Sequence, residues 1–180
     1  MRPEIKLTVF LVAAVLTWGT IFSLAGCSNS PKRKARTVAE RALYATVENP
    51  NSVKILAVSK PDSVYGREYI TMDEQMNIAK TMMKVNQEVM RVTDNFDNIN
   101  PADKTVSSLM ERQMNAMSAM RSIVRVSGEE TGKKKPFTGW KVKIDYQAQT
   151  ADGVPYHAEY WFFLDKEGTC VVKSFEIPII

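Results

Sequence analysis

Apolar residues between positions 36 and 48 recur every three or four residues, which is the spacing of one face of an α-helix. Thr37 and Glu40 fit the capping box that begins a helix. Ser30 followed by Pro31 offers an alternative start one or two turns earlier. The pattern therefore predicts an amino-terminal helix that has two possible starts.

Two prolines bracket the next apolar segment. Pro50 ends the helix, and Pro61 follows residues 52–59, which are rich in valine, isoleucine and other apolar residues. Because the segment is short and carries β-branched residues, it predicts a strand. Residues 61–66 contain proline, aspartate, serine and glycine, and they predict a turn after that strand.

The helical spacing then returns in two consecutive segments. Thr71 and Glu74 form a capping box, and the stripe after them consists of Ile78, Met82, Val85, Val89 and Val92. At the second start Asn100 is the expected cap, Pro101 the first helical residue, and Asp103 lies in the first turn, where the helix dipole favours it. The second apolar stripe consists of Val106, Met110, Met114, Met117, Met120 and Val124.

Two helices of about twenty residues joined by a short polar connection predict an antiparallel αα-hairpin at about residues 71–127. Every methionine except Met1 lies between Met72 and Met120. A methionine-rich stripe can form an adaptable binding surface, but such stripes more often form core. We expect the methionines to pack as core.

The last forty residues alternate between apolar and polar, which predicts an antiparallel β-meander. A loop at 151–155 sets three pairs opposite one another on the core face: Tyr146 with Tyr160, Ile144 with Phe162, and Val142 with Leu164. The next turn is expected at 165–168. In the strand that follows, Cys170 and Val172 are expected to continue the core face, so Cys170 is read as a small buried residue.

The opposite face of this sheet is apolar in its second and third strands, where it carries Trp161, Phe163, Val171, Phe175 and Ile177. A sheet that is apolar on both faces must be covered on both. The helical hairpin is the expected cover, and a partner protein is the alternative. Under that alternative, Trp161, Phe163 and Phe175 are the candidate interaction surface.

The predicted class is α+β, with the amino-terminal helix packed on an antiparallel curved sheet and the hairpin inserted after the first strand. This order, over about residues 36–177, resembles the cystatin-like and nuclear-transport-factor-2-like group. The group's fold is reused for unrelated functions. A cavity between the sheet and the first helix would be lined by Trp140, Tyr146, Tyr160 and Phe162.

The first 26 residues have the layout of an export signal. Arg2 and Lys6 precede an uncharged run, and small residues close it. The end of this segment, Leu24-Ala25-Gly26-Cys27, resembles the lipobox of bacterial lipoproteins. The resemblance implies cleavage before Cys27 and acylation of that cysteine, and Ser28 after it favours the outer over the inner membrane. A retained signal anchor is the alternative, because twenty uncharged residues are long enough to span a bilayer.

The charge of the chain is concentrated next to that cysteine. The sequence has 24 basic and 20 acidic residues, and four of the basic ones are Lys32, Arg33, Lys34 and Arg36. We expect residues 27–36 to form a lipidated basic tether beside anionic headgroups or in solvent, and residues 37–180 to form one domain. Because that domain is nearly neutral, the basic excess does not indicate nucleic-acid binding.

Motifs of catalysis are missing. His157 is the only histidine, and no glycine-rich phosphate-binding pattern is present. Asp145 and Glu159 are expected on a solvated face rather than as a catalytic pair. We therefore predict no enzymatic activity, no cofactor and no metal. The expected function is that of an envelope lipoprotein that binds a protein partner, and the alternative is a small-ligand carrier.

Overall fold

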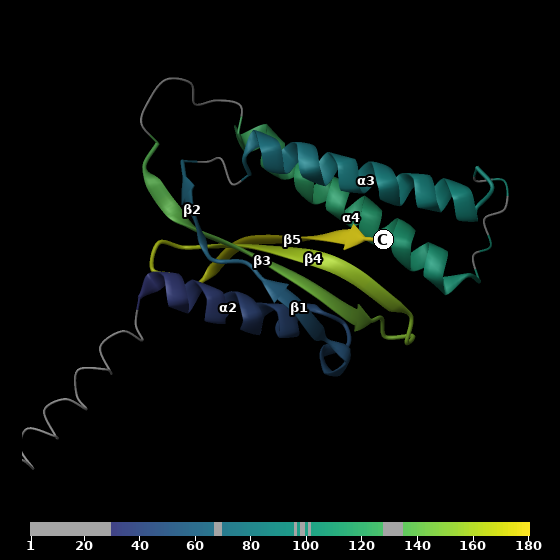
Figure 1. Cartoon of the computed structure of the whole chain (residues 1–180), viewed down its shortest axis with the longest axis horizontal. Coiled ribbons are helices and arrows are strands. Elements are labelled where there is room, and N and C mark those ends of the chain that lie inside the picture. The colour runs from purple at the N-terminus through teal and green to yellow at the C-terminus, as the bar shows by residue number, and fades with distance from the viewer. Residues whose placement is uncertain (1–29, 67–69, 96, 98–99, 101, 128–134) are drawn as a thin grey trace, which may run out of the picture.

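The computed structural model describes residues 30–66, 70–95, 97, 100, 102–127 and 135–180 (Figure 1). The predicted signal and Cys27 lie outside these residues. The described helices are α2 (Pro31–Thr46), α3 (Met72–Val92) and α4 (Lys104–Ser127), with a short 3-10 turn at Pro50–Ser52. The strands are β1 (Lys54–Val58), β2 (Asp62–Tyr65), β3 (Phe137–Gln149), β4 (Pro155–Leu164) and β5 (Val171–Ile179).

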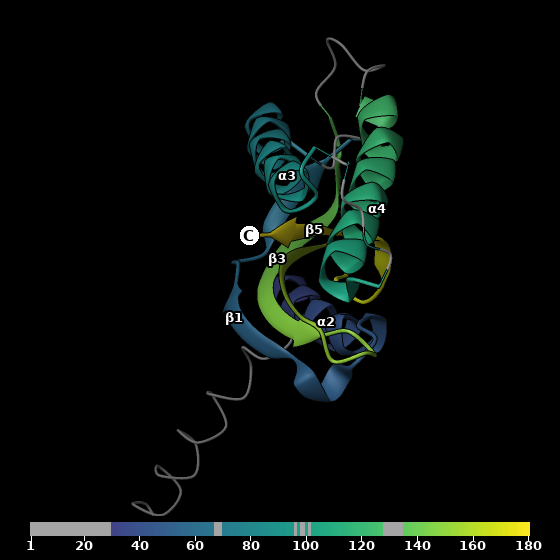
Figure 2. The same ribbon diagram turned by 90° about the vertical axis from the view of Figure 1, so that its right-hand side faces the viewer.

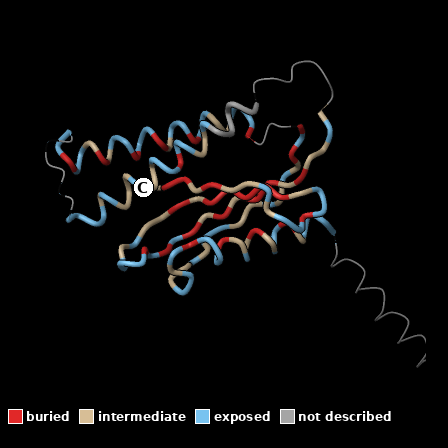
Figure 3. Tube along the Cα trace, turned by 180° about the vertical axis from the view of Figure 1, so that it is seen from behind, coloured by how far each residue is buried: buried red, intermediate tan, exposed pale blue. Residues whose placement is uncertain are grey.

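These elements form the predicted α+β fold. The antiparallel sheet has the order β1-β3-β4-β5, and β2 pairs with the part of β3 that lies beyond β1. The sheet is curved, with α2 on one face and the α3–α4 hairpin on the other (Figures 1 and 2). Each face has its own apolar core, so the sheet is buried between two helical layers (Figure 3).

Helix α2 begins at the earlier of the two predicted starts. The Ser30 side chain accepts a hydrogen bond from the Arg33 backbone N–H, and Pro31 is the first helical residue. Ala35, Ala39 and Leu43 are fully buried against the sheet, so the apolar stripe reaches one turn further than the capping-box start allowed. The expected tether at 27–36 is therefore wrong from residue 31 onward, because those residues are helical.

The turn expected at 61–66 is wrong, since residues 62–65 form β2. This strand pairs with β3, and its Val64 is buried under the hairpin. The side chain of Thr138 adds a hydrogen bond to the Val64 carbonyl. The turn propensity of residues 61–66 is outweighed because β3 extends beyond β1. The backbone groups of that extension would otherwise lack partners, and β2 supplies them.

The hairpin is present, but its second helix differs from prediction. Helix α3 has the expected capping box between Thr71 and Glu74. Helix α4 begins later than expected, because the Asp103 carboxylate, rather than Asn100, accepts the backbone N–H groups of the first turn. Its stripe is also rotated: Ala116 is buried, whereas Met114 and Met117 are exposed. Small side chains let α4 lie close to the sheet, and those methionines are therefore not core.

Strands β3 and β4 pair on the predicted face but two residues away from the predicted register. Ile144 lies opposite Tyr160, Val142 opposite Phe162, and Trp140 opposite Leu164. The shift arises because Pro155 pairs with Gln149 and so belongs to the strand. The loop is therefore residues 150–154. A shift of two positions leaves every side chain on the same face.

The third strand contradicts the sequence prediction at its start. A bulge after the Phe163–Lys173 pair places Val171 opposite Leu164, so Val171 packs in the core under α2. Cys170 and Val172 are exposed rather than buried. One extra residue in a bulged strand moves each side chain beyond the bulge to the opposite face of the sheet.

Candidate functional site

The predicted interaction surface is covered within the chain. Trp161, Phe163 and Phe175 are almost completely buried beneath α3 and α4, where the rings of Trp161 and Phe175 stack 5.6 Å apart. Their exposure was expected only if no element covered the second face. The hairpin covers it, and these three side chains cannot meet a partner while the hairpin is docked.

The predicted cavity under α2 is filled. Tyr146 and Phe162 are fully buried, and they pack with Tyr160 and the inner face of α2 in one core cluster. Trp140 lies half-buried at the edge of this cluster. Of these four residues only Tyr160 borders a described hollow, and that hollow lies beside α4. The alternating aromatic residues of β3 and β4 therefore form the core under α2 and do not line a cavity there.

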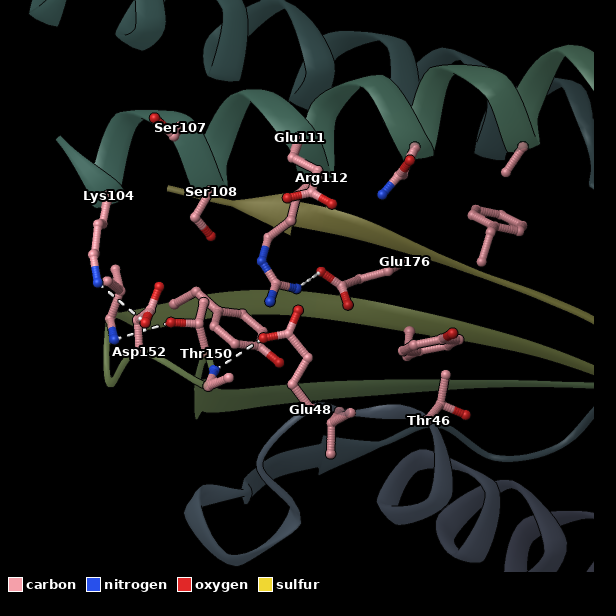
Figure 4. A pocket seen from close by; sticks show the side chains of 18 of the residues that line it. Thr46, Glu48, Lys104, Ser107, Ser108, Glu111, Arg112, Thr150, Asp152 and Glu176 are labelled. Atoms are coloured by element: carbon pink, nitrogen blue, oxygen red, sulfur yellow. Dashed lines mark hydrogen bonds and ion pairs between the residues drawn. The ribbon is translucent and has the colours of Figure 1, made fainter. Parts of the chain in front are cut away.

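A cleft of about 550 Å³ lies between α4 and the edge of the sheet. Its walls come from α4 between Lys104 and Ala119, the end of α2, the β3–β4 loop, β4 and β5 (Figure 4). The volume falls in the range of small-molecule sites, roughly 300–1,000 Å³. Polar and charged side chains predominate: Glu48, Lys104, Ser107, Ser108, Glu111, Arg112, Asn115, Thr150, Asp152, Ser174 and Glu176.

Arg112 extends from α4 into the cleft toward Glu176 (Figure 4). Its Nη1 lies 2.5 Å from Oε1 of Glu176, and its guanidinium carbon lies 3.3 Å from the centroid of the Tyr156 ring. The Nε atom is buried and has no hydrogen-bond partner among the described residues. Burial opposes the charged form of Arg112, but the Glu176 carboxylate outweighs burial and raises the guanidinium pKa.

Glu176 joins this arginine to the core under α2. Its second oxygen accepts a 2.8 Å hydrogen bond from the Tyr146 hydroxyl, which lies on the same face of the sheet. Burial raises the pKa of Tyr146 well above its usual range, and the charge of Glu176 raises it further. Tyr146 is thus a fixed donor, and the network orients Glu176 toward Arg112.

The rim of the cleft is more acidic than basic. Lys104 and Asp152 form an exposed ion pair 3.1 Å apart at the mouth. Glu48 accepts the backbone N–H of Ala151. Among the lining residues four are carboxylates and two are cations, and one of the four, Glu111, is exposed on the α4 side. The cleft therefore offers a negative field to an incoming group.

A smaller hollow of about 280 Å³ lies between α3 and the sheet. Glu74 and Lys143 line it, and the Glu74 carboxylate lies 2.6 Å from the ammonium group of Lys141, whose side chain is 3% exposed, and 3.6 Å from that of Lys143. Lys143 also lies over the Trp161 ring, 4.8 Å from its centroid. These contacts fasten the start of α3 to β3, so we assign them a structural role.

The single histidine has an acidic neighbour. His157 Nε2 lies 2.6 Å from Asp145 Oδ1 on the adjacent strand, with both side chains about one third exposed. Glu159 accepts the indole N–H of Trp161. No serine or cysteine of the described residues is hydrogen-bonded to His157. A His–Asp pair orients an imidazole, but acyl transfer also requires a nucleophile within reach.

In the part of the chain that the structure describes, no group of three or more His, Cys, Asp or Glu side chains is arranged to hold a metal ion. Among the described helices none has the length and apolar content needed to cross a bilayer. Cys27, the predicted lipidation site, lies outside the described residues.

Sequence reasoning missed the cleft. Arg112 and Glu176 are 64 residues apart in the sequence, and no local motif links them. The available signal was its position on α4, where its side chain falls on the same face as buried Ala116, but the stripe was assigned to the methionines instead. Comparison with protein-family models, curated proteins and solved structures finds no significant match to this chain.

Proposed function

We propose that this chain is a membrane-anchored envelope lipoprotein that acts as a non-enzymatic protein-interaction module, with the cleft beside α4 as its binding site. The lipobox resemblance at Leu24–Cys27 and the favoured outer-membrane location are parts of this proposal. So is the resemblance to the cystatin-like and nuclear-transport-factor-2-like group.

The observation that carries the proposal is the position of the cleft relative to the anchor. The start of α2 lies four residues after Cys27, and its last residue, Thr46, lines the cleft together with Glu48. A helix of 16 residues is about 24 Å long at 1.5 Å per residue. An acylated Cys27 thus holds one end of the domain at the bilayer and leaves the cleft at the other end.

The lining favours a charged partner segment. Ligand pockets for drug-sized molecules are predominantly apolar, whereas this cleft is lined mainly by hydroxyl, amide and charged groups. Its acidic rim complements a basic segment, and rim charges of this kind accelerate and select association. We therefore propose a protein partner that inserts a lysine- or arginine-bearing loop.

A small-ligand carrier is the second candidate, because the volume of about 550 Å³ suits a small molecule. The same carboxylates favour an organic cation over an anion. A carrier would bind such a cation in the isolated protein, whereas the interaction module requires the partner.

The test places a photo-crosslinking residue at Ser107 on the cleft rim and, as a control, at Gln87 on the exposed side of α3. In the native envelope we expect a protein adduct from position 107 that disappears when Glu111→Lys reverses the rim charge. Glu88→Lys, which changes the same charge outside the cleft, should leave the adduct intact. Equal adducts from positions 107 and 87, or an adduct insensitive to Glu111→Lys, would count against the cleft.

A further inference from the structure

We infer that the end of the domain next to Cys27 is a membrane-docking surface, at which partly exposed aromatic rings and exposed basic side chains rest on the anionic phospholipid headgroups of the bilayer that holds the anchor. This inference rests on the proposed acylation of Cys27. It concerns the end of the molecule opposite the cleft.

The chain leaves little room between lipid and fold. Only Ser28, Asn29 and Ser30 separate Cys27 from Pro31, the first residue of α2. An extended chain covers at most about 3.5 Å per residue, so the two Cα atoms lie within about 14 Å of each other. The first turn of α2 is therefore held at the depth of the headgroups.

Several segments meet the start of α2 at this end (Figure 1). Gly168, in the β4–β5 turn, lies so close that a Cβ atom there would be 2.2 Å from the Pro31 carbonyl oxygen. The same turn accepts the indole N–H of Trp140 at the carbonyl of Lys166, 3.0 Å away. The start of α2, the turn and Trp140 are thus neighbours.

Trp140 belongs to an aromatic cluster at the surface. Its ring packs edge-on against Phe137, at 5.2 Å between centroids, and Phe137 packs in the same way against Tyr65, at 5.9 Å. Tyr65 is 50% exposed, and the other two rings are half-buried. Tryptophan and tyrosine are enriched at membrane–water interfaces because one end of each ring system is apolar and the other is polar.

The charges beside this cluster are mainly basic. Lys32, Arg33 and Arg36 are exposed on the first turns of α2, and Lys166 is exposed in the adjacent turn, next to Glu167. Three other carboxylates at this end have intramolecular partners: Glu40 pairs with Arg36, Asp62 pairs with Lys141, and Asp165 accepts backbone N–H groups from Thr169 and Cys170. Basic residues next to a bilayer are attracted to anionic lipids.

The basic side chains at the start of α2 lie at the helix end where the helix dipole disfavours positive charge. The positive end of the helix dipole favours acidic residues, and the first turn of α3 carries Asp73 and Glu74. The first turn of α2 has no acidic residue and carries Lys32, Arg33 and Lys34. An anionic surface at this point would compensate the unfavourable placement, as phosphate groups do at other helix starts.

The test uses the acylated mature protein in vesicles of phosphatidylethanolamine and phosphatidylglycerol whose acyl chains carry bromine near the headgroup end. Trp18 is removed with the signal, and Trp161 is buried under the hairpin, so quenching reports on Trp140. We expect brominated lipid to quench the wild-type fluorescence and to leave Trp140→Phe unquenched. The double variant Lys32→Glu/Arg36→Glu should lose at least half of the quenching.

Lys80→Glu/Lys84→Glu is the matched control, because it reverses two exposed cations on α3, in the opposite layer. It should quench like the wild type. Protein that sediments with the vesicles but shows no more quenching than Trp140→Phe overturns the docking surface and leaves the anchor intact. Protein that carries no acyl chain and stays in solution overturns the anchor and the docking surface together.

Discussion

Arg112 holds the hairpin to the sheet through contacts with two strands. Its guanidinium pairs with Glu176 on β5 and lies over Tyr156 on β4, and both charged side chains are largely buried, with 14% and 20% of their areas exposed. Removing one partner of a buried pair leaves the other charge uncompensated, and this commonly destabilises a fold by about 3–5 kcal/mol.

We therefore expect Arg112→Ala to lower the free energy of unfolding by about 3 kcal/mol, measured by urea denaturation. Lys104→Ala is the control, because its ion pair with Asp152 is exposed on both sides and should contribute less than about 1 kcal/mol. Equal losses from the two variants would mean that the buried pair does not fasten α4.

At the residue scale, the sequence predicted which face of the sheet a side chain occupies better than it predicted which residues form the cleft. The alternation in 140–149 correctly placed Val142, Ile144 and Tyr146 in the core, because period-two burial is a local property. Arg112 and Glu176 come from separate parts of the chain, and their meeting depends on the angle at which α4 crosses the sheet. No local pattern carries that information, so the cleft could not be predicted.

Glu74 performs two tasks at the start of α3. It closes the capping box with Thr71 and pairs with the buried Lys141 of β3. Burial raises the pKa of Glu74, but the hydrogen bond from Lys141 and the backbone N–H of Thr71, together with the charges of Lys141 and Lys143, lower it on balance. The carboxylate is therefore held in its charged form, and it ties the hairpin to the sheet.

This arrangement predicts a pH dependence. Because the folded-state pKa of Glu74 lies below its ordinary value of 4.5, its stabilising contribution is complete above that pH and is lost as the pH falls through the lower folded-state value. Glu74→Gln should lower the free energy of unfolding at neutral pH, and the difference from wild type should shrink below pH 4.5.

Denaturant titrations at several pH values measure this difference. Glu88→Gln, which alters an exposed pair on the same helix, should cost little at any pH. A Glu74→Gln deficit that persists unchanged in acid would place the loss in packing or capping rather than in the charge of the carboxylate.

At the element scale, the presence of helices and strands was easier to predict than the register in which the strands pair. The capping box of α3, the hairpin and the three long strands were all legible in the sequence, because caps and periodicity act over a few residues. The β3–β4 register, the bulge in β5 and the strand β2 depend on pairing between distant segments. Such pairing is decided by tertiary packing, and this is why Cys170 and Val172 were assigned to the wrong environment.

At the scale of the whole molecule, the two ends carry different surfaces. The start of α2, the β4–β5 turn and the aromatic cluster of Tyr65, Phe137 and Trp140 lie at one end, and the cleft lies at the other (Figures 1 and 4). Under our proposal the first end rests on the bilayer, and the second faces the envelope compartment and its partner. This division requires a fixed attachment near residue 30, which acylation of Cys27 would supply.

The most direct test of this account is the intact mass of the mature protein isolated from its own membrane. We predict a chain that begins at Cys27 and carries the mass of a diacylglyceryl group with an additional acyl chain, and a Cys27→Ala variant that keeps residues 1–26 and no lipid. A mature wild-type chain cleaved at another residue, or one that begins at Cys27 without lipid, would contradict the anchor and with it the assignment of the two ends.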